Sequence, residues 1–192
     1  MARVTYISHP EVVIDPAVPV PRWHLSDAGL HRMRAFAGVL PRPDAVWAST
    51  ECKAIEAAGV LAGRHGLPVR VHPGLDENDR EATGYLPPDR FQAAADAFFA
   101  HPAASFQGWE RAVYAQARVV AAWAEILEDR GDIALVGHGG TGTLLMCHLG
   151  KSPISRTHDA PGQGCFWVWD RGAGRLLGAW RLMEAFGTSH AG

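Results

Sequence analysis

The sequence predicts an α/β fold, a three-layer α/β/α sandwich in which helices cover both faces of a mostly parallel sheet of roughly six strands. Two observations indicate this architecture. Short strand-like segments alternate with helical segments along the chain, which is typical of parallel sheets covered by helices. Residues 133–136 (Ile-Ala-Leu-Val) form an uninterrupted apolar run, as expected for a strand covered on both faces. Because 192 residues suit one domain and no internal repeat divides them, we expect residues 1–192 to form a single domain.

The first half of the chain alternates strands and helices around a proline-rich loop at residues 15–21. Ser26 is a typical helix N-cap, and the apolar residues after it recur on one helical face until Pro41. These signals predict strands at 4–7, 44–49 and 68–71, and helices at 26–40 and 51–65.

The second half begins with a polar segment rich in glycine and proline, residues 74–88, which predicts a loop or lid. We expect residues 78–105 to act as a specificity loop. The later elements are predicted as a helix near 109–127, a buried strand at 133–136, a helix at 141–149, and a closing hairpin of strands at 165–169 and 175–180.

Composition excludes several classes of partner. A formal net charge of −2 leaves no excess of basic residues for nucleic acid. No apolar run approaches the roughly 18–20 residues needed to span a bilayer, so no membrane association is expected. Three scattered cysteines without a Cys-x-x-Cys pair favour reduced thiols and a cytoplasmic location over a disulfide framework or a zinc site. The sequence carries no signal for an oligomeric state.

Ligands of open parallel sheets bind beyond the carboxyl ends of the strands. The residues that follow the predicted strands include two histidines, a lysine and a glutamate, which are His9, His138, Lys53 and Glu77. Ser8 directly precedes His9, and Gly139 directly follows His138. The glycines after His138 allow backbone N–H groups to approach an anion at a helix N-terminus. The sequence therefore predicts an anion site shared by His9 and His138.

The order and spacing of five segments resemble the histidine phosphatase superfamily, also called phosphoglycerate mutase-like, over about residues 3–182. Residues 8–10 of this chain (Ser-His-Pro) correspond to Arg-His-Gly of the family, and residues 25–29 correspond to its Leu-Thr-x-x-Gly motif. Residues 48–58 correspond to the family's Ser-Ser-Pro-Leu-x-Arg-Ala-x-x-Thr-Ala segment. Residues 75–77 contain the counterpart of its loop glutamate, and residues 136–140 correspond to its Val-x-His-Gly-Gly turn. The resemblance implies a phosphoglycerate mutase-like fold, a phosphorylated nucleophile at His9, a proton donor at Glu77 and a phosphate contact at His138.

The chain departs from this family where phosphate is held. Two arginines that clamp the phosphoryl oxygens in the family are Ser8 and Lys53 here, and an asparagine of some members is Asp15. Lys53 keeps a charge without the planar guanidinium fork, and Arg22 could supply the other charge from the end of the proline-rich loop. Because a charged hydrogen bond contributes about 1.5–3 kcal/mol, the loss of two would weaken transition-state binding by several powers of ten.

The remaining residues suffice for phosphoryl transfer without a metal or cofactor. A neutral His9 imidazole attacks phosphorus, and Glu77 gives the leaving oxygen its proton. His138 and Lys53, with the backbone N–H of Gly139, hold the phosphoryl oxygens. We therefore expect a phosphomonoesterase of a small phosphorylated substrate that releases inorganic phosphate and acts through a phosphohistidine at His9.

Two alternatives remain open. A mutase is less favoured, because the additional basic residues that hold a second phosphate are not found. A non-catalytic descendant of the same fold would bind phosphate or another anion without turnover. Ser8 favours this descendant, whereas the joint presence of His9, Glu77 and His138 favours the enzyme.

Overall fold

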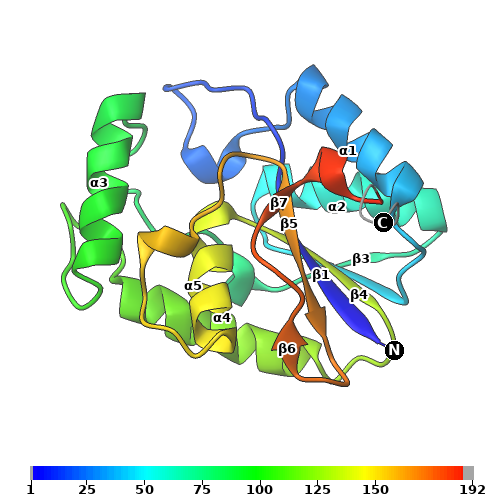
Figure 1. Ribbon diagram of the computed structural model, residues 1–192. Coiled ribbons are helices and arrows are strands. Elements are labelled where there is room, and N and C mark those ends of the chain that lie inside the picture. Colours follow the sequence, from blue (N-terminus) through cyan, green and yellow to red (C-terminus); the bar gives the residue numbers. More distant parts are fainter. Residues whose placement is uncertain (1, 188–192) are drawn as a thin grey trace.

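A computed structural model of the protein describes residues 2–187, in which seven strands form one mixed sheet (Figure 1). The sheet order is β3-β2-β4-β1-β5-β6, and β7 pairs with the other half of β5. Four strands run parallel to one another: β1 (Arg3–Ser8), β2 (Ala45–Ala48), β3 (Val69–Val71) and β4 (Ile133–Gly137). Three strands extend the sheet in antiparallel fashion: β5 (Cys165–Asp170), β6 (Arg175–Leu176) and β7 (Arg181–Leu182).

Helices cover both faces of this sheet, which confirms the predicted three-layer architecture. One layer holds α1 (Asp27–Val39) and α2 (Cys52–His65), and the opposite layer holds α4 (Ala112–Ile126) and α5 (Gly139–Leu149). Each layer has its own apolar core, because side chains of the central strands alternate between the two faces. Short 3₁₀ helices complete the described chain: η1 (Val20–Arg22), η2 (Pro73–Leu75), η3 (Arg156–His158) and η4 (Met183–Ala185).

The closing hairpin differs from its prediction in one respect. The strand expected over 175–180 is only two residues long, since β6 ends at Leu176. The chain then leaves the sheet and returns as β7, which pairs with Cys165 and Phe166. The sheet therefore gains a seventh strand in place of one longer sixth strand.

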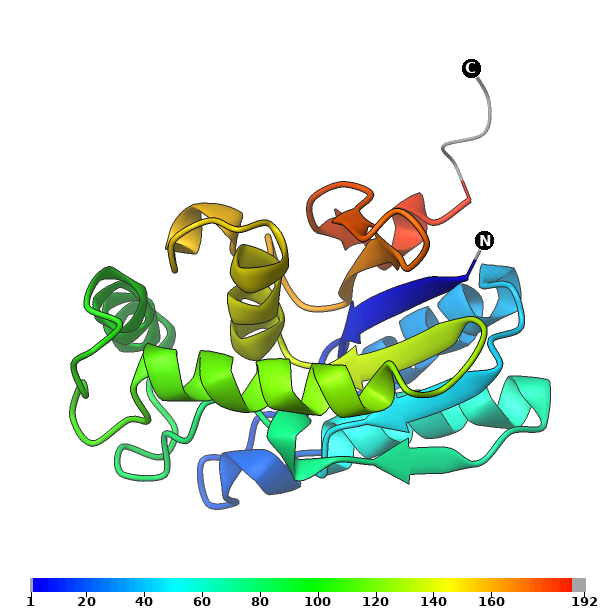
Figure 2. The same cartoon turned by 90° about the horizontal axis from the view of Figure 1, so that it is seen from below.

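Segment 78–105, predicted as a specificity loop, is not a continuous loop, because it contains α3 (Pro88–Ala100). Pro88 occupies the first turn, where a missing N–H costs nothing. Phe98 and Phe99 of α3 pack with Trp109 and with Leu144 of α5 in a third apolar cluster. Figures 1 and 2 show α3 set apart from the sheet, beyond α4 and α5. This helix therefore forms a wall beside the strand ends.

The register of β1 and β4 determines where their histidines emerge. Ser8 pairs with Gly137, so the residues after both strands leave the sheet side by side. The hydroxyl of Tyr6 donates to the carbonyl of His138 and accepts from its N–H, each at 3.1 Å. A Cβ on Gly137 would lie 2.3 Å from that hydroxyl, which explains the glycine at this position.

All three cysteines are free, and Cys147 and Cys165 are buried. None of the helices in the described chain has both the length and the apolar character to cross a membrane.

Candidate active site

His9 and His138 meet at the carboxyl ends of β1 and β4. Their ring centroids lie 5.2 Å apart with the planes inclined by 70°. His138 is fully buried, and His9 is half-buried and lines a cavity of about 490 Å³. The predicted convergence of the two histidines is therefore present in the structure.

The ring of His9 is held by a hydrogen bond between Nδ1 and the carbonyl oxygen of Pro10 at 2.8 Å. A carbonyl only accepts, so Nδ1 carries the proton in this bond and Nε2 keeps its lone pair. Burial, helped by the positive charge of Lys53, lowers the pKa of His9 to about 4. At neutral pH the imidazole is therefore uncharged and has a free nitrogen lone pair, as a nucleophile requires.

His138 is held by a different contact. Its Nε2 lies 2.7 Å from Oγ of Ser49, and that oxygen also accepts the N–H of Glu51 at 3.2 Å. The Ser49 hydroxyl has no other acceptor among the described residues, so we assign its proton to the bond with Nε2 and the imidazole proton to Nδ1. Nδ1 is buried and has no hydrogen-bond partner among the described residues. Burial lowers the pKa of His138 well below its ordinary value, so this ring is also neutral.

Lys53 and Glu51 form a buried ion pair next to His138. The Lys53 ammonium donates to the carbonyl of Val20 at 2.9 Å and to Oε2 of Glu51. The other Glu51 oxygen accepts the N–H of Glu77 at 2.9 Å and lies 3.5 Å from Nε2 of His138. Burial opposes the charge of Glu51, but the ammonium of Lys53 and the N–H of Glu77 outweigh it and lower the pKa of Glu51 to about 2. No third acceptor of Lys53 lies among the described residues, so one of the three ammonium protons remains for a ligand.

The sequence patterns do not single out Glu51, although it stands two residues before Lys53, whose position the family resemblance marks. The family has leucine at the position that corresponds to Glu51. A carboxylate in place of this leucine is the sequence signal that points to Glu51. Its carboxylate neutralises much of the charge that Lys53 brings to the site. The structure thus adds an anion where the family resemblance implies none.

Glu77 lines the same cavity and is anchored at the N-terminus of α5. Its carboxylate accepts the N–H groups of Gly140 at 3.1 Å, Thr141 at 2.9 Å and Asn78 at 3.1 Å. A Cβ on Gly140 would lie 2.7 Å from Oε1, so glycine is required for this close approach. Arg118 of α4 holds the same loop through the carbonyls of Gly74, Asp76 and Glu77. Gly139 lines the cavity, and its N–H makes no hydrogen bond with the described chain.

Ser8, Asp15 and Arg22, which are predicted to contact phosphate, are placed differently in the structure. Ser8 lines the cavity, but its hydroxyl is used by β5: it accepts the N–H of Cys165 at 2.9 Å and donates to the carbonyl of Cys165 at 3.2 Å. Asp15 and Arg22 are exposed and do not line the cavity. The reason is the fold of the proline-rich loop, which buries Trp23 through bonds from its indole N–H to the carbonyls of Asp15 and Val18. The structure therefore corrects the expectation that Asp15 and Arg22 reach the phosphate.

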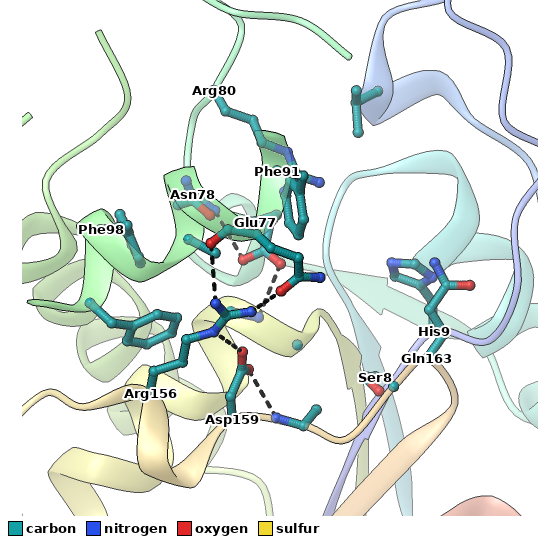
Figure 3. Close-up of a pocket in the computed structure, with 18 of the residues that line it drawn as sticks. Ser8, His9, Glu77, Asn78, Arg80, Phe91, Phe98, Arg156, Asp159 and Gln163 are labelled. Atoms are coloured by element: carbon teal, nitrogen blue, oxygen red, sulfur yellow. Dashed lines mark hydrogen bonds and ion pairs between the residues drawn. The ribbon is translucent and has the colours of Figure 1, made fainter. Parts of the chain in front are cut away.

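Segment 78–105, predicted as a loop, contributes another part of the cavity wall, and residues 156–163 after α5 contribute a further part (Figure 3). Aromatic rings of α3, including Phe91 and Phe98, face the cavity together with Trp109. Arg80 and Arg156 also line it. A second cavity of about 650 Å³ adjoins the first, and the two share Val20, Glu77, Asn78 and Arg80 in their walls.

The site combines two neutral imidazoles at the ends of adjacent parallel strands with a buried lysine and a helix N-terminus. This combination is typical of an α/β protein that binds a small anion. The chain belongs to the histidine phosphatase superfamily, branch 1, whose family model matches residues 20–170. Membership supports a phosphatase or other phosphoryl-transfer role. The match begins after His9, so the segment Ser8-His9-Pro10 lies outside it. No curated protein matches the chain.

Solved structures share the fold along nearly the whole chain. Mycobacterial glucosyl-3-phosphoglycerate phosphatase in complex with inorganic phosphate is 23% identical, with a TM-score of 0.75 and 95% of each chain covered. Its complex with VO₃ is 22% identical, with a TM-score of 0.76 and coverage of 95% of this chain and 97% of that chain. The protein YhfR of Bacillus stearothermophilus is 19% identical, with a TM-score of 0.76 and coverage of 91% and 93%. At these identities the similarity establishes the fold.

Proposed function

We propose that the protein is a metal-independent phosphomonoesterase that acts on a small substrate through a phosphohistidine at His9. The observation that carries the proposal is the state of His9: a neutral ring held at Nδ1 by Pro10, with Nε2 unprotonated at the wall of the cavity. His138 beside it has a buried nitrogen without a partner, which an oxygen of a bound phosphoryl group would satisfy.

In the first half of the reaction, the lone pair of His9 Nε2 attacks phosphorus and forms a P–N bond while the ester P–O bond breaks. The leaving oxygen takes its proton from the Glu77 carboxyl group. The third donor of Lys53, the N–H of Gly139 and the protonated nitrogen of His138 hold the phosphoryl oxygens.

In the second half, water attacks the phosphorus of phosphohistidine and gives a proton to the Glu77 carboxylate. The P–N bond breaks, its electron pair returns to His9 Nε2, and inorganic phosphate leaves. Glu77 is again protonated, so the cycle closes without a net change in the enzyme.

We also propose that the protein acts in the cytoplasm, which is consistent with its three free cysteines. In this proposal the 192 residues form one domain.

The second candidate is an anion-binding protein without turnover. The observation that favours it is the weak positive charge of the site, since Ser8 is bonded to β5 and Lys53 is paired with Glu51. Such a protein would bind phosphate between the same histidines and form no covalent intermediate.

Turnover of p-nitrophenyl phosphate in the presence of a chelator tests both candidates, with His9→Ala as the inactive variant and His31→Ala, an exposed histidine, as the control. We expect chelator-resistant turnover and an acid-labile phosphoryl group on the wild type and on His31→Ala, and neither on His9→Ala. Phosphate binding without turnover would support the anion-binding protein. Activity that a chelator abolishes and a divalent metal restores would contradict the histidine mechanism.

A further inference from the structure

The loop between η2 and α3 carries two hydrogen-bond donors that the mechanism above does not use, Asn78 and Arg80. Both line the cavity beside His9 and the adjoining one, so they lie where the two cavities meet. Neither side chain belongs to a motif that the family resemblance marks. Their state in the structure indicates a ligand.

Arg80 differs from the other cations of the cavity wall, Lys53 and Arg156, because it has no anionic partner in the part of the chain that the structure describes. Lys53 is paired with Glu51, and Arg156 is paired with Asp96 and with Asp159. The guanidinium of Arg80 makes no hydrogen bond or ion pair with the described residues.

Aromatic rings hold the Arg80 guanidinium in place. Its central carbon lies 5.0 Å from the ring centroid of Phe91 and 6.0 Å from that of Trp109. Contact with ring faces stabilises the cation and leaves the N–H donors in the guanidinium plane free. In Figure 3 the side chain extends from its loop past Phe91, toward the side of the cavity on which His9 lies.

Asn78 provides a second, independent observation. Its side chain is only 5% exposed, yet its Nδ2 has no hydrogen-bond partner among the described residues. Buried amide donors are nearly always paired, because an unpaired one has lost its water without compensation. A donor left unpaired in a cavity wall therefore points to an oxygen supplied by the ligand.

We propose that Arg80 and Asn78 form the oxyanion clamp that replaces the arginine missing at position 8, binding the phosphoryl group from the loop side of the cavity. The inference rests on the proposed function, because it takes a phosphoryl group as the ligand. A guanidinium can hold two phosphoryl oxygens at once, and Asn78 can donate to a third. Burial is the main cause of the lowered pKa of both His9 and His138, and the charge of Arg80 contributes at both, which places it within electrostatic reach of the two rings.

The test compares Arg80→Ala, Arg80→Lys and Asn78→Asp with the wild type. The probes are turnover of p-nitrophenyl phosphate and the binding of inorganic phosphate measured by calorimetry. Arg111→Ala is the matched control, since Arg111 is also an arginine stacked on an aromatic ring, 5.4 Å from the centroid of Tyr114, but is exposed and outside both cavities. Thermal unfolding confirms that each variant is folded.

We expect Arg80→Ala to weaken phosphate binding and to lower kcat/KM by about 10- to 150-fold, as for the loss of one charged hydrogen bond. Arg80→Lys restores part of both, because it keeps the charge and loses the fork. Asn78→Asp places a negative charge beside the phosphoryl group and weakens phosphate binding without changing the shape of the side chain. Arg111→Ala leaves both measurements unchanged.

Two outcomes overturn the clamp while leaving the proposed function intact. In the first, the wild type turns over substrate, and Arg80→Ala has the same phosphate affinity and the same kcat/KM. The other is a raised KM in Arg80→Ala with unchanged phosphate binding, which would assign Arg80 to the leaving group. A wild type that binds phosphate without turnover, with binding lost in Arg80→Ala, supports the clamp and contradicts the enzyme. A wild type that neither binds phosphate nor turns over substrate overturns both.

Discussion

The two sides of the cavity differ in how far the protein itself satisfies their polar groups. On the strand side, His9, Lys53 and Glu77, whose carboxylate reaches the N-terminus of α5, are bonded to carbonyls, carboxylates or N–H groups of the chain, and Nδ1 of His138 is left without a partner among the described residues. On the loop side, Arg80 and Asn78 carry donors that have no partner among residues 2–187. The comparison indicates that the strand side is already arranged for chemistry, whereas the loop side awaits the ligand that completes it.

The largest expected effect concerns the strand side. Glu77→Gln removes the carboxyl proton, and we expect kcat to fall by about 10²- to 10⁴-fold, the range for loss of a general acid–base group. The loss should be smaller for p-nitrophenyl phosphate than for an alkyl phosphate, because a good leaving group needs less protonation. Values of kcat for the two esters measure this difference, and Glu81→Gln, which alters an exposed glutamate, is the control. Equal losses on both esters would reduce Glu77 to an anchor for α5.

The buried ion pair of the strand side gives the next effect. Glu51→Gln leaves the Lys53 charge without its partner, and breaking such a pair costs about 3–5 kcal/mol of stability. Added phosphate should then stabilise the variant more than the wild type, because the freed ammonium binds the anion more tightly. Urea unfolding with and without phosphate measures both effects.

The matched control for this pair is Glu125→Gln. Glu125 also pairs with a basic side chain, His72 at 3.0 Å, but it is exposed, so its loss should cost at most about 1 kcal/mol. Equal destabilisation by the two substitutions would show that burial does not strengthen the Glu51 pair.

The buried imidazoles predict an acid-sensitive fold. Because burial lowers the pKa of His9 to about 4 while the unfolded chain titrates near 6.5, the unfolded state binds more protons between these pH values. Stability contributed by neutral His9 is therefore present above pH 6.5 and is lost as the pH falls toward 4, by up to about 3 kcal/mol. Urea unfolding at several pH values measures the slope.

Two asparagine variants identify the source of that slope. His9→Asn keeps a donor near the Pro10 carbonyl but cannot titrate, so its stability should fall less between pH 6.5 and 4. His31→Asn alters an exposed histidine and should retain the wild-type slope. If His9→Asn keeps the full slope, His9 is not the group that titrates.

The smallest effect connects the two sides. Ser8→Arg would place a guanidinium on the strand side, and in the Arg80→Ala background we expect it to restore about tenfold in kcat/KM. With Arg80 present the gain should be smaller, because the phosphoryl oxygens are already held. The four variants of this double-mutant cycle measure the coupling, and strict additivity would show that the two positions do not serve the same oxygens.

Local patterns determined much of the strand side. The apolar run 133–136, the glycines after His138 and the proline after His9 are signals within a few residues of one another, so the strand ends could be recognised without tertiary information. Ser26 likewise caps α1 as predicted, accepting the N–H of Gly29 at 3.1 Å. Helix α3 also had a local signal, since Pro88 begins it and its buried side chains recur at helical spacing, but the surrounding glycines and prolines favoured a loop.

Only the tertiary structure decided which polar side chains reach the cavity. Arg22 follows the proline-rich segment 15–21 and Arg80 lies within the polar loop between η2 and α3, and no local pattern shows which of the two reaches the cavity. Burial of Trp23 leaves Arg22 outside, whereas the rings of Phe91 and Trp109 hold Arg80 inside. Side-chain direction in a loop depends on contacts made far along the chain, whereas strand and helix periodicity depends on neighbouring residues. The sequence alone therefore determined the layers and the two histidines, and packing between distant segments determined the rest of the site.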